Sequence, residues 1–194
     1  QRSGAGGGRP YRKHGAMKLR VSLFSLLLLA ACATAPTGPG YRDTGQPLSV
    51  TTRSDHARLS GDWVLRAATP PTPDMAGLVA VGFRPGETDT FTFTRRVCDA
   101  GGACETRRIT RTATVLGPNR WRLSGPSGAL ELWVVWVDEG YRTAAIGTPD
   151  GSFGWVLDRA ASGGGDRITA AREILEFNGY DEGALRMRPE GDNT

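Results

Sequence analysis

The segments Gly61-Asp62-Trp63, Val137-Asp138-Glu139-Gly140-Tyr141-Arg142 and Arg159 occur in this order and decide the fold of the chain. Each adjoins a run of residues typical of β-strands, and Arg159 closely follows the apolar run Trp155-Val156-Leu157. Motifs this short occur by chance in many proteins, so only their order and spacing are informative. Their interpretation therefore depends on the strands and turns around them.

Short β-prone runs alternate with turn signals through most of the chain after residue 60. They predict strands at residues 61–68, 76–84, 88–97, 105–116, 119–125, 129–137, 141–147 and 152–158. Breaks such as Arg84-Pro85-Gly86 and Gly117-Pro118-Asn119 separate them. The pattern is typical of a sandwich or a barrel, and the hairpin length of the connections favours an all-β, eight-stranded antiparallel up-and-down barrel.

A single helix is predicted after the last of these strands, over residues 166–178. Asp166 is suited to cap its N-terminus, and Gly179 suits the position after its C-terminus. The residues of its apolar face are Ile168, Ala171, Ile174 and Leu175. We expect this helix to cover the outer wall of the barrel, followed by a short final strand around residues 185–187.

In their order and spacing, the three segments resemble the lipocalin signature. The resemblance implies that Trp63, on the first strand, lies at a closed end of the barrel beneath Arg159. It also implies that Asp138, Tyr141 and Arg142 mark the turn between the sixth and seventh strands. A guanidinium over an indole gains cation–π attraction, and its donors can bind carbonyls of the closing loop. One end is then sealed and the other is left for a ligand.

Between residues 130 and 189 the chain is similar to the bacterial branch of the lipocalins, which are outer-membrane lipoproteins. The similarity rests on Asp-x-x-Tyr-Arg, then Pro149-Asp150, then Trp155-Val156-Leu157-Asp158-Arg159, and a helix ending in Gly179-Tyr180-Asp181. Residues 74–127 match the family poorly. The resemblance therefore implies the fold more directly than it implies the ligand.

The N-terminal part of the chain resembles a bacterial lipoprotein signal. Residues 17–31 combine a positive start, an apolar run too short to span a bilayer, and small residues. The run ends Leu29-Ala30-Ala31-Cys32, which resembles a lipobox and implies that Cys32 is lipidated. In well-studied Gram-negative lipoproteins, an Asp after the lipidated Cys is linked to retention in the inner membrane. Residue 33 is Ala, so the resemblance implies the outer membrane, with the domain facing the periplasm. The alternative is an ordinary signal peptide with an incidental Cys32.

Charge gives no support to nucleic-acid binding once the signal is set aside. The chain has 24 basic and 20 acidic residues, but six basic residues and no acidic ones precede Cys32. The mature chain keeps 18 basic and 20 acidic residues, a net charge of about −2. We expect residues 1–16 to be a non-native or misassigned upstream segment, 32–56 a lipidated Cys and flexible tether, and 57–194 one barrel domain.

Two cysteines, Cys98 and Cys104, flank a short segment between the third and fourth predicted strands. In an oxidising compartment they are expected to form a disulfide across the hairpin tip, which adds about 2–3 kcal/mol in the chain-entropy model. The alternative, a metal site, lacks partners, because His56 is the only histidine after the signal. We therefore expect no metal.

The sequence offers little that resembles a catalytic centre. It contains no Gly-x-Ser-x-Gly and no His-Glu-x-x-His motif. The run Gly163-Gly164-Gly165 lies in no βαβ context and is interpreted as a flexible link into the helix. Asp138 and Glu139 form a carboxylate pair, but their place in the turn motif favours a structural role. We expect no enzyme and no cofactor.

A ligand site is expected inside the barrel, where alternate residues of each strand point inward. The candidate ligand-binding residues are Val81, Phe83, Phe91, Phe93, Trp121, Leu123, Trp133 and Val135, and Val79 belongs to the same alternating set. Two alternatives remain open: these residues fill a solid core, or the opposite faces of the strands point inward.

Arginines near the disulfide tip suggest a second element of the site. They are Arg95, Arg96, Arg107, Arg108 and Arg111. Arg111 is the candidate for binding a fatty-acid carboxylate or a phospholipid headgroup at the barrel mouth, because arginine binds such anions with paired donors. The alternative is a solvated outer face.

Three functions fit these observations. The first is a lipid-anchored lipocalin that binds, stores or transports a small hydrophobic ligand, such as a fatty acid or lysophospholipid, at the bacterial outer membrane. The second is a periplasmic protein-binding barrel such as a protease inhibitor, which shares the Gly-x-Trp and the Cys pair but lacks the C-terminal helix. The third is an envelope structural or stress lipoprotein with a filled barrel. The resemblance favours the first, with a hydrophobic ligand and the membrane as partners and no nucleic acid.

Overall fold

The computed structural model describes Gly4, Gly7, Gly8 and residues 40–125 and 128–189. The signal segment predicted over residues 17–31 and the lipidation site predicted at Cys32 lie outside the described residues. Within the described part, no helix is both long enough and apolar enough to cross a membrane. The architecture below is that of the unit Pro36–Thr194.

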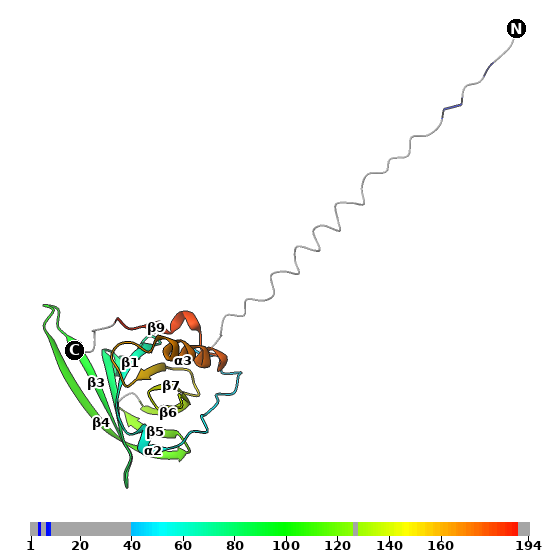
Figure 1. Ribbon diagram of the computed structural model, residues 1–194. Coiled ribbons are helices and arrows are strands. Elements are labelled where there is room, and N and C mark those ends of the chain that lie inside the picture. The colour runs from blue at the N-terminus through cyan, green and yellow to red at the C-terminus, as the bar shows by residue number, and fades with distance from the viewer. Residues whose placement is uncertain (1–3, 5–6, 9–39, 126–127, 190–194) are drawn as a thin grey trace. The chain divides into compact units, whose positions relative to one another are not determined.

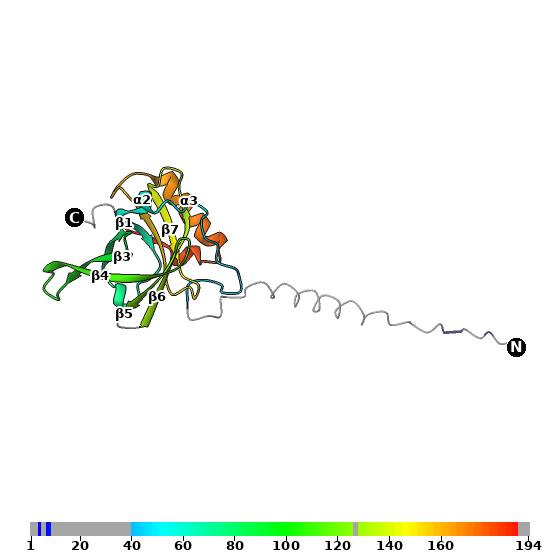
Figure 2. The same cartoon turned by 90° about the horizontal axis from the view of Figure 1, so that it is seen from below.

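Eight antiparallel strands form one closed barrel (Figures 1 and 2). The strands are β1 (Gly61–Ala68), β2 (Leu78–Arg84), β3 (Thr90–Cys98), β4 (Cys104–Gly117), β5 (Arg120–Gly125), β6 (Gly128–Val137), β7 (Thr143–Gly147) and β8 (Gly154–Asp158). Each pairs with the next along the chain, and β1 closes the barrel by pairing with both β2 and β8. A short strand, β9 (Arg186–Met187), pairs with β1 outside the barrel. The predicted up-and-down barrel is confirmed.

The two ends of the barrel are built from different connections. The β1–β2, β3–β4 and β7–β8 connections lie at one end, which we call the mouth. The β2–β3, β4–β5 and β6–β7 connections lie at the other end, together with the short helix α2 (His56–Leu59), and we call this end the floor. The β1–β2 connection contains a 3-10 turn, η1 (Pro73–Met75), whose Met75 is buried.

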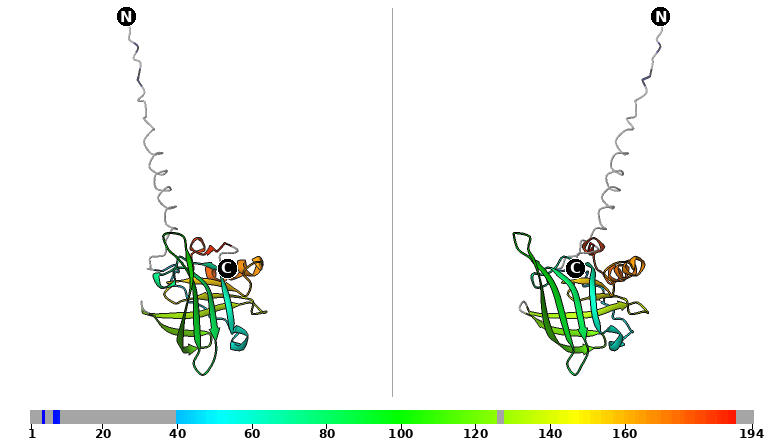
Figure 3. Two further views of the ribbon diagram at one scale, coloured as in Figure 1. Left: turned by 90° about the vertical axis from the view of Figure 1, so that its left-hand side faces the viewer. Right: turned by 60° about the vertical axis from the view of Figure 1, so that its left-hand side comes forward.

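Helix α3 (Gly165–Phe177) covers the outer wall as predicted (Figure 3). Ile168, Ala171 and Leu175 are buried in a cluster that includes residues from the outward faces of the strands. The predicted cap at Asp166 is wrong: Gly164, in a left-handed conformation, precedes the helix, and Asp166 lies in its first turn. The chain turns sharply into the helix at the glycine run, so the cap position falls two residues earlier than expected.

Tyr180 ties the end of α3 to the mouth of the barrel. Its hydroxyl accepts a hydrogen bond from the Thr148 amide at 2.8 Å and donates to the Phe153 carbonyl at 2.8 Å. A Cβ on Gly147 or on Gly154 would lie 2.8 Å from the Tyr180 side chain, so glycine is required at both positions. Burial raises the pKa of Tyr180 to about 12, so the hydroxyl keeps its proton at neutral pH.

Residues 40–55 lie along the barrel, although the sequence assigned them to a flexible tether. Arg42 is 2% exposed, and its guanidinium donates to the carbonyls of Asn178, at 2.8 Å, and Pro149, at 2.9 Å. The Thr51 amide donates to the Val134 carbonyl at 2.9 Å. Backbone and arginine hydrogen bonds hold this segment, and such contacts leave no apolar periodicity in the sequence.

Arg159 and Trp63 close the floor. The Arg159 guanidinium carbon lies 3.6 Å from the Trp63 ring centroid. The same guanidinium donates to the carbonyls of Arg58 and Ser60, both at 2.8 Å, and of Asp62 at 3.0 Å. The Trp63 indole N–H donates to the Leu59 carbonyl at 2.9 Å. One charged group therefore joins β1, α2 and the end of β8.

The β6–β7 turn is held by Asp138. Its carboxylate accepts hydrogen bonds from the amides of Arg142, at 2.5 Å, and Thr143, at 2.7 Å. Burial raises the pKa of this carboxyl, but the bonds from Thr143 and Arg142 outweigh it and hold the pKa below its usual value. Tyr141 has a φ of 55°, which ends the extended geometry, and β7 therefore starts at Thr143 instead of residue 141.

We expect Arg159→Ala to lower the free energy of unfolding by about 2–4 kcal/mol, because it removes a cation–π contact and several charged hydrogen bonds. Urea denaturation measures this loss. Arg159→Lys keeps the charge without the planar fork and should recover only part of it. The control is Arg122→Ala, whose exposed ion pair with Glu131 should contribute less than about 1 kcal/mol. Equally small losses at both positions would contradict the closing role of Arg159.

Candidate functional site

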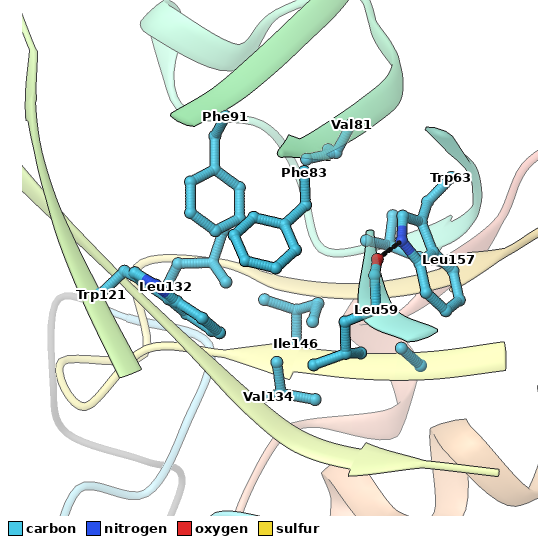
Figure 4. Close-up of a pocket in the computed structure, with 11 residues that line it drawn as sticks. Leu59, Trp63, Val81, Phe83, Phe91, Trp121, Leu132, Val134, Ile146 and Leu157 are labelled. Atoms are coloured by element: carbon cyan, nitrogen blue, oxygen red, sulfur yellow. Dashed lines mark hydrogen bonds between the residues drawn. The ribbon is translucent and has the colours of Figure 1, made fainter. Parts of the chain in front are cut away.

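The barrel interior next to the floor holds a small apolar cavity of about 30 Å³ (Figure 4). Its lining residues come from α2 and seven of the strands: Leu59, Trp63, Val81, Phe83, Phe91, Trp121, Leu132, Val134, Ala144, Ile146 and Leu157. Known ligand pockets have volumes of about 300–1,000 Å³. The cavity therefore has room for a water-sized group, and side chains fill the rest of this space.

Three aromatic rings pack against one another beside the cavity. Phe83 and Phe91 are stacked with centroids 4.8 Å apart, and Trp121 lies edge-on to them at 5.1 and 5.4 Å. The Trp121 indole N–H donates to the Asp89 carboxylate at 2.7 Å. His56 stands 5.4 Å from the Trp121 ring, measured between centroids. Asp89 is thus a buried acceptor that fixes the orientation of one wall of the cavity.

The interior nearer the mouth is also filled. Phe153 and Trp155 are stacked at 4.2 Å, and Phe93 lies edge-on to Trp155 at 6.3 Å. Met75, from the β1–β2 connection, and Leu78 are buried in the same core cluster. Apolar packing therefore continues from the floor toward the mouth.

Most predicted ligand-binding residues lie in this interior core. They are Val81, Phe83, Phe91, Phe93, Trp121 and Leu123. Val79 does not: the β2–β3 register shifts between Leu78 and Ala80, Leu78 takes the interior position, and Val79 lines an outer groove.

Trp133 and Val135 were predicted to face inward, and this is wrong. Leu132 and Val134 occupy the interior, whereas Val135 is buried in the outer cluster near α3. Trp133 lies outside, with the Arg120 guanidinium 5.3 Å from its ring centroid. Both faces of this part of β6 are apolar, because one faces the barrel interior and the other packs in the outer cluster that includes α3. The two-residue period therefore could not distinguish them.

Arg111 lies on the inward face of β4 with its guanidinium beside Gly125, where β5 ends at the mouth. It pairs with Phe91, which points inward, and paired residues of antiparallel strands share a face. Its guanidinium carbon is 5.5 Å from the centroid of the Phe93 ring. Arg95 and Arg107 pair with each other on the same face, whereas Arg108 lies on the opposite face and lines an outer groove.

The predicted disulfide is confirmed: Cys98 and Cys104 are bonded at the tip of the β3–β4 hairpin. Among residues 40–125 and 128–189, no group of three or more His, Cys, Asp or Glu side chains is arranged to hold a metal ion. The sequence did not identify Asp89 or Leu59 as parts of the site. A polar residue in a turn and a short helix before the first strand carry no period that would indicate burial.

Comparisons with known proteins agree with this architecture. A sequence model described as a lipocalin-like domain matches residues 87–190. No curated protein sequence is a significant match for the chain. Lobster apocrustacyanin A1 has a similar structure, with 12% identity and a TM-score of 0.55 over 72% of this chain and 82% of that one.

Two insect proteins are similar in the same way. Insecticyanin of the tobacco hornworm Manduca sexta gives a TM-score of 0.56 at 12% identity, covering 78% of this chain and 87% of its own. The cockroach allergen Per a 4 gives a TM-score of 0.55 at 13% identity, covering 73% and 92%. These likenesses concern the fold, and the family match spans more than half of the sequence. The chain therefore belongs to the family of lipocalin-like domains.

Proposed function

We propose that the protein is a binding protein whose barrel takes up a small hydrophobic ligand, such as a fatty acid or a lysophospholipid. The observation that carries this proposal is the composition of the interior: every residue that lines the cavity is aliphatic or aromatic. A lipocalin barrel of eight strands is of a size that can hold one small ligand. With the floor held by Arg159, the ligand would enter at the mouth.

The small cavity sets a condition on this binding. A volume of about 30 Å³ does not hold an acyl chain, so entry requires interior rings to move. Phe83 and Phe91 are held by ring contacts, whereas Trp121 is also hydrogen-bonded to Asp89. We therefore expect the two phenylalanines to yield to a ligand before Trp121 does.

Arg111 is placed to receive an acidic headgroup at the mouth. Its guanidinium is half-buried beside the aromatic core, with an apolar ring on one side. A bound carboxylate or phosphate would gain paired hydrogen bonds, while the acyl chain would extend toward the floor. This arrangement favours anionic lipids over neutral ones.

The location proposed for the protein is the bacterial outer membrane, with the barrel facing the periplasm and anchored through a lipidated Cys32. The support is the lipobox-like sequence before Cys32 and the resemblance of residues 130–189 to the bacterial branch of the lipocalins. An anchored barrel would receive or deliver lipid close to the membrane surface.

A second candidate function follows from the filled interior. A barrel whose core is occupied by its own side chains is a stable module that needs no ligand. An envelope structural or stress lipoprotein would have this property. The small cavity favours this candidate, and the apolar lining together with Arg111 favours the carrier.

Co-purification separates the two candidates. We expect full-length protein purified from a bacterial host to carry lipid that mass spectrometry identifies after extraction. After lipid removal, titration with oleate should change the tryptophan fluorescence, because Trp63 and Trp121 line the cavity. Protein that purifies without lipid and whose fluorescence ignores oleate would refute the carrier and support the filled barrel.

Arg111→Ala should weaken binding of oleate by about tenfold, since one charged hydrogen-bonding partner is worth about 1.5–3 kcal/mol before solvent screening. Binding of the neutral alcohol of the same chain length should change little. Arg122→Ala, which removes an arginine from the outer face, is the matched control. Equal losses for both probes, or none, would exclude Arg111 as the headgroup partner.

Cys32→Ser should release the protein from the membrane. Cells fed a radiolabelled fatty acid should label the wild-type chain and leave the variant unlabelled, and fractionation should move the variant into the soluble periplasm. Label that persists in the variant would show that Cys32 is not the anchoring residue.

A further inference from the structure

Strand β4 has a long backbone edge that no other described strand covers. β4 spans Cys104–Gly117, 14 residues, but β5 pairs with it only from Ala113 onward. On its other side, β3 pairs with it as far as Cys104. Residues 104–112 therefore form an open edge, which Figure 1 shows on β4. Behind residues 107–112, β3 is itself paired with β2, and only residues 104–106 belong to a two-stranded tip.

The direction of the free backbone groups follows from the pairing. The Ala113 amide donates to the Asp89 carbonyl, on the side of β3. Because N–H and C=O groups of successive residues point to opposite sides of a strand, Thr106, Arg108 and Thr110 direct theirs away from β3. These residues are a ready template for a further strand.

The edge is held in a fixed shape. β3 and β2 back residues 107–112, and the hydroxyls of Thr92 and Thr110 hydrogen-bond between β3 and β4 at 2.9 Å. The disulfide joins β3 and β4 at the two-stranded tip, which would otherwise be marginally stable in water. A stiffened edge loses less entropy when a partner binds, so it is organised in advance for recognition.

The chemistry of the edge is basic. Arg107, Arg108 and Arg111 lie on β4, and Arg95 pairs with Arg107 from β3. Ile109, 39% exposed, is the apolar residue between them. Glu105 also lies on this strand and binds the Arg107 guanidinium. In an antiparallel pair of two copies, a register centred on Arg107 or on Arg108 places arginine opposite arginine, whereas one centred on Thr106 places Arg107 opposite Glu105. With three arginines and one glutamate, residues 104–112 attract an acidic segment more strongly than a second copy of the chain.

We propose that the free edge of β4 binds an extended acidic peptide segment as an added strand. The backbone of the segment would pair with Thr106, Arg108 and Thr110. Alternate side chains of the segment would lie beside Arg107, Ile109 and Arg111. A segment with an apolar residue and an acidic residue two positions before it and two positions after it would therefore fit this face. Arg111 is shared with the headgroup site proposed at the mouth, whereas the backbone groups of Thr106, Arg108 and Thr110 have no part in that site.

The test uses the full chain and the fluorescent octapeptide Glu-Thr-Val-Thr-Glu-Thr-Val-Thr, whose first and fifth residues would lie opposite Arg111 and Arg107, with a valine opposite Ile109. Thr110→Pro removes one N–H that faces the open edge and leaves the β3 ladder intact. Thr110→Ala is the matched control, since it loses the same hydroxyl and keeps the N–H. We expect the wild-type chain and Thr110→Ala to bind alike and Thr110→Pro to bind about tenfold more weakly or worse. A fully N-methylated peptide should not bind.

Other outcomes would overturn the proposal. Equal binding to Thr110→Pro, or binding of the N-methylated peptide, would show that no added strand forms. If the wild-type chain and Thr110→Pro bind phosphatidylglycerol vesicles equally well and neither binds the peptide, the arginines bind lipid headgroups instead of a peptide. Dimers in sedimentation that Thr110→Pro abolishes would assign the edge to a second copy. If Thr110→Pro fails to fold, the double variant Arg107→Glu with Arg108→Glu replaces it in the test. The proposal then requires that the double variant bind a peptide with lysine in place of glutamate more tightly than the original peptide.

Discussion

The Arg159 guanidinium is the contact on which the barrel floor depends. It lies on the Trp63 ring and donates hydrogen bonds to backbone carbonyls of the segment that leads into β1. The backbone amide of Arg159 donates to the Arg142 carbonyl. The carbonyls before β1 have no ladder partner there, and a buried carbonyl without a donor is costly. One side chain meets this need for several of them. Like the β1–β8 pairing that closes the barrel, this contact joins segments that lie far apart in the sequence.

A sealed floor changes what the interior can do. Because Arg159 and Trp63 close the floor, a side chain that moves to make space for a ligand has to move toward the mouth. Folding stability and the proposed ligand uptake would therefore depend on the same residues, because the rings of Phe83, Phe91 and Trp121 line the cavity that a ligand would have to enlarge. Close packing stabilises the empty state, and a ligand must replace those contacts with equivalent ones. The hydrogen bond from Trp121 to Asp89 fixes one wall, so the opposite rings carry the adjustment.

The sequence predicted the fold well and the site unevenly, for physical reasons. Trp63 and Arg159 were identifiable through the resemblance to the lipocalin signature, which implies that these two residues meet at the closed end of the barrel. Trp133 and Val135 were assigned to the wrong face because outer contacts make β6 apolar on both sides. The sequence predicts a tether over residues 32–56, because the backbone hydrogen bonds and the buried Arg42 that hold residues 40–55 leave no periodic pattern.

The length of β4 separates what the barrel requires from what it does not. β4 joins β5 in the barrel only through the residues from Ala113 to Gly117. The preceding residues bury little apolar surface, and the two-stranded tip at residues 104–106 would be unstable by itself. They are nevertheless extended and fastened by the Cys98–Cys104 disulfide, and three arginines lie along them. Ordering a segment that adds little to the core costs conformational entropy, and the proposed binding of an added strand would account for this order.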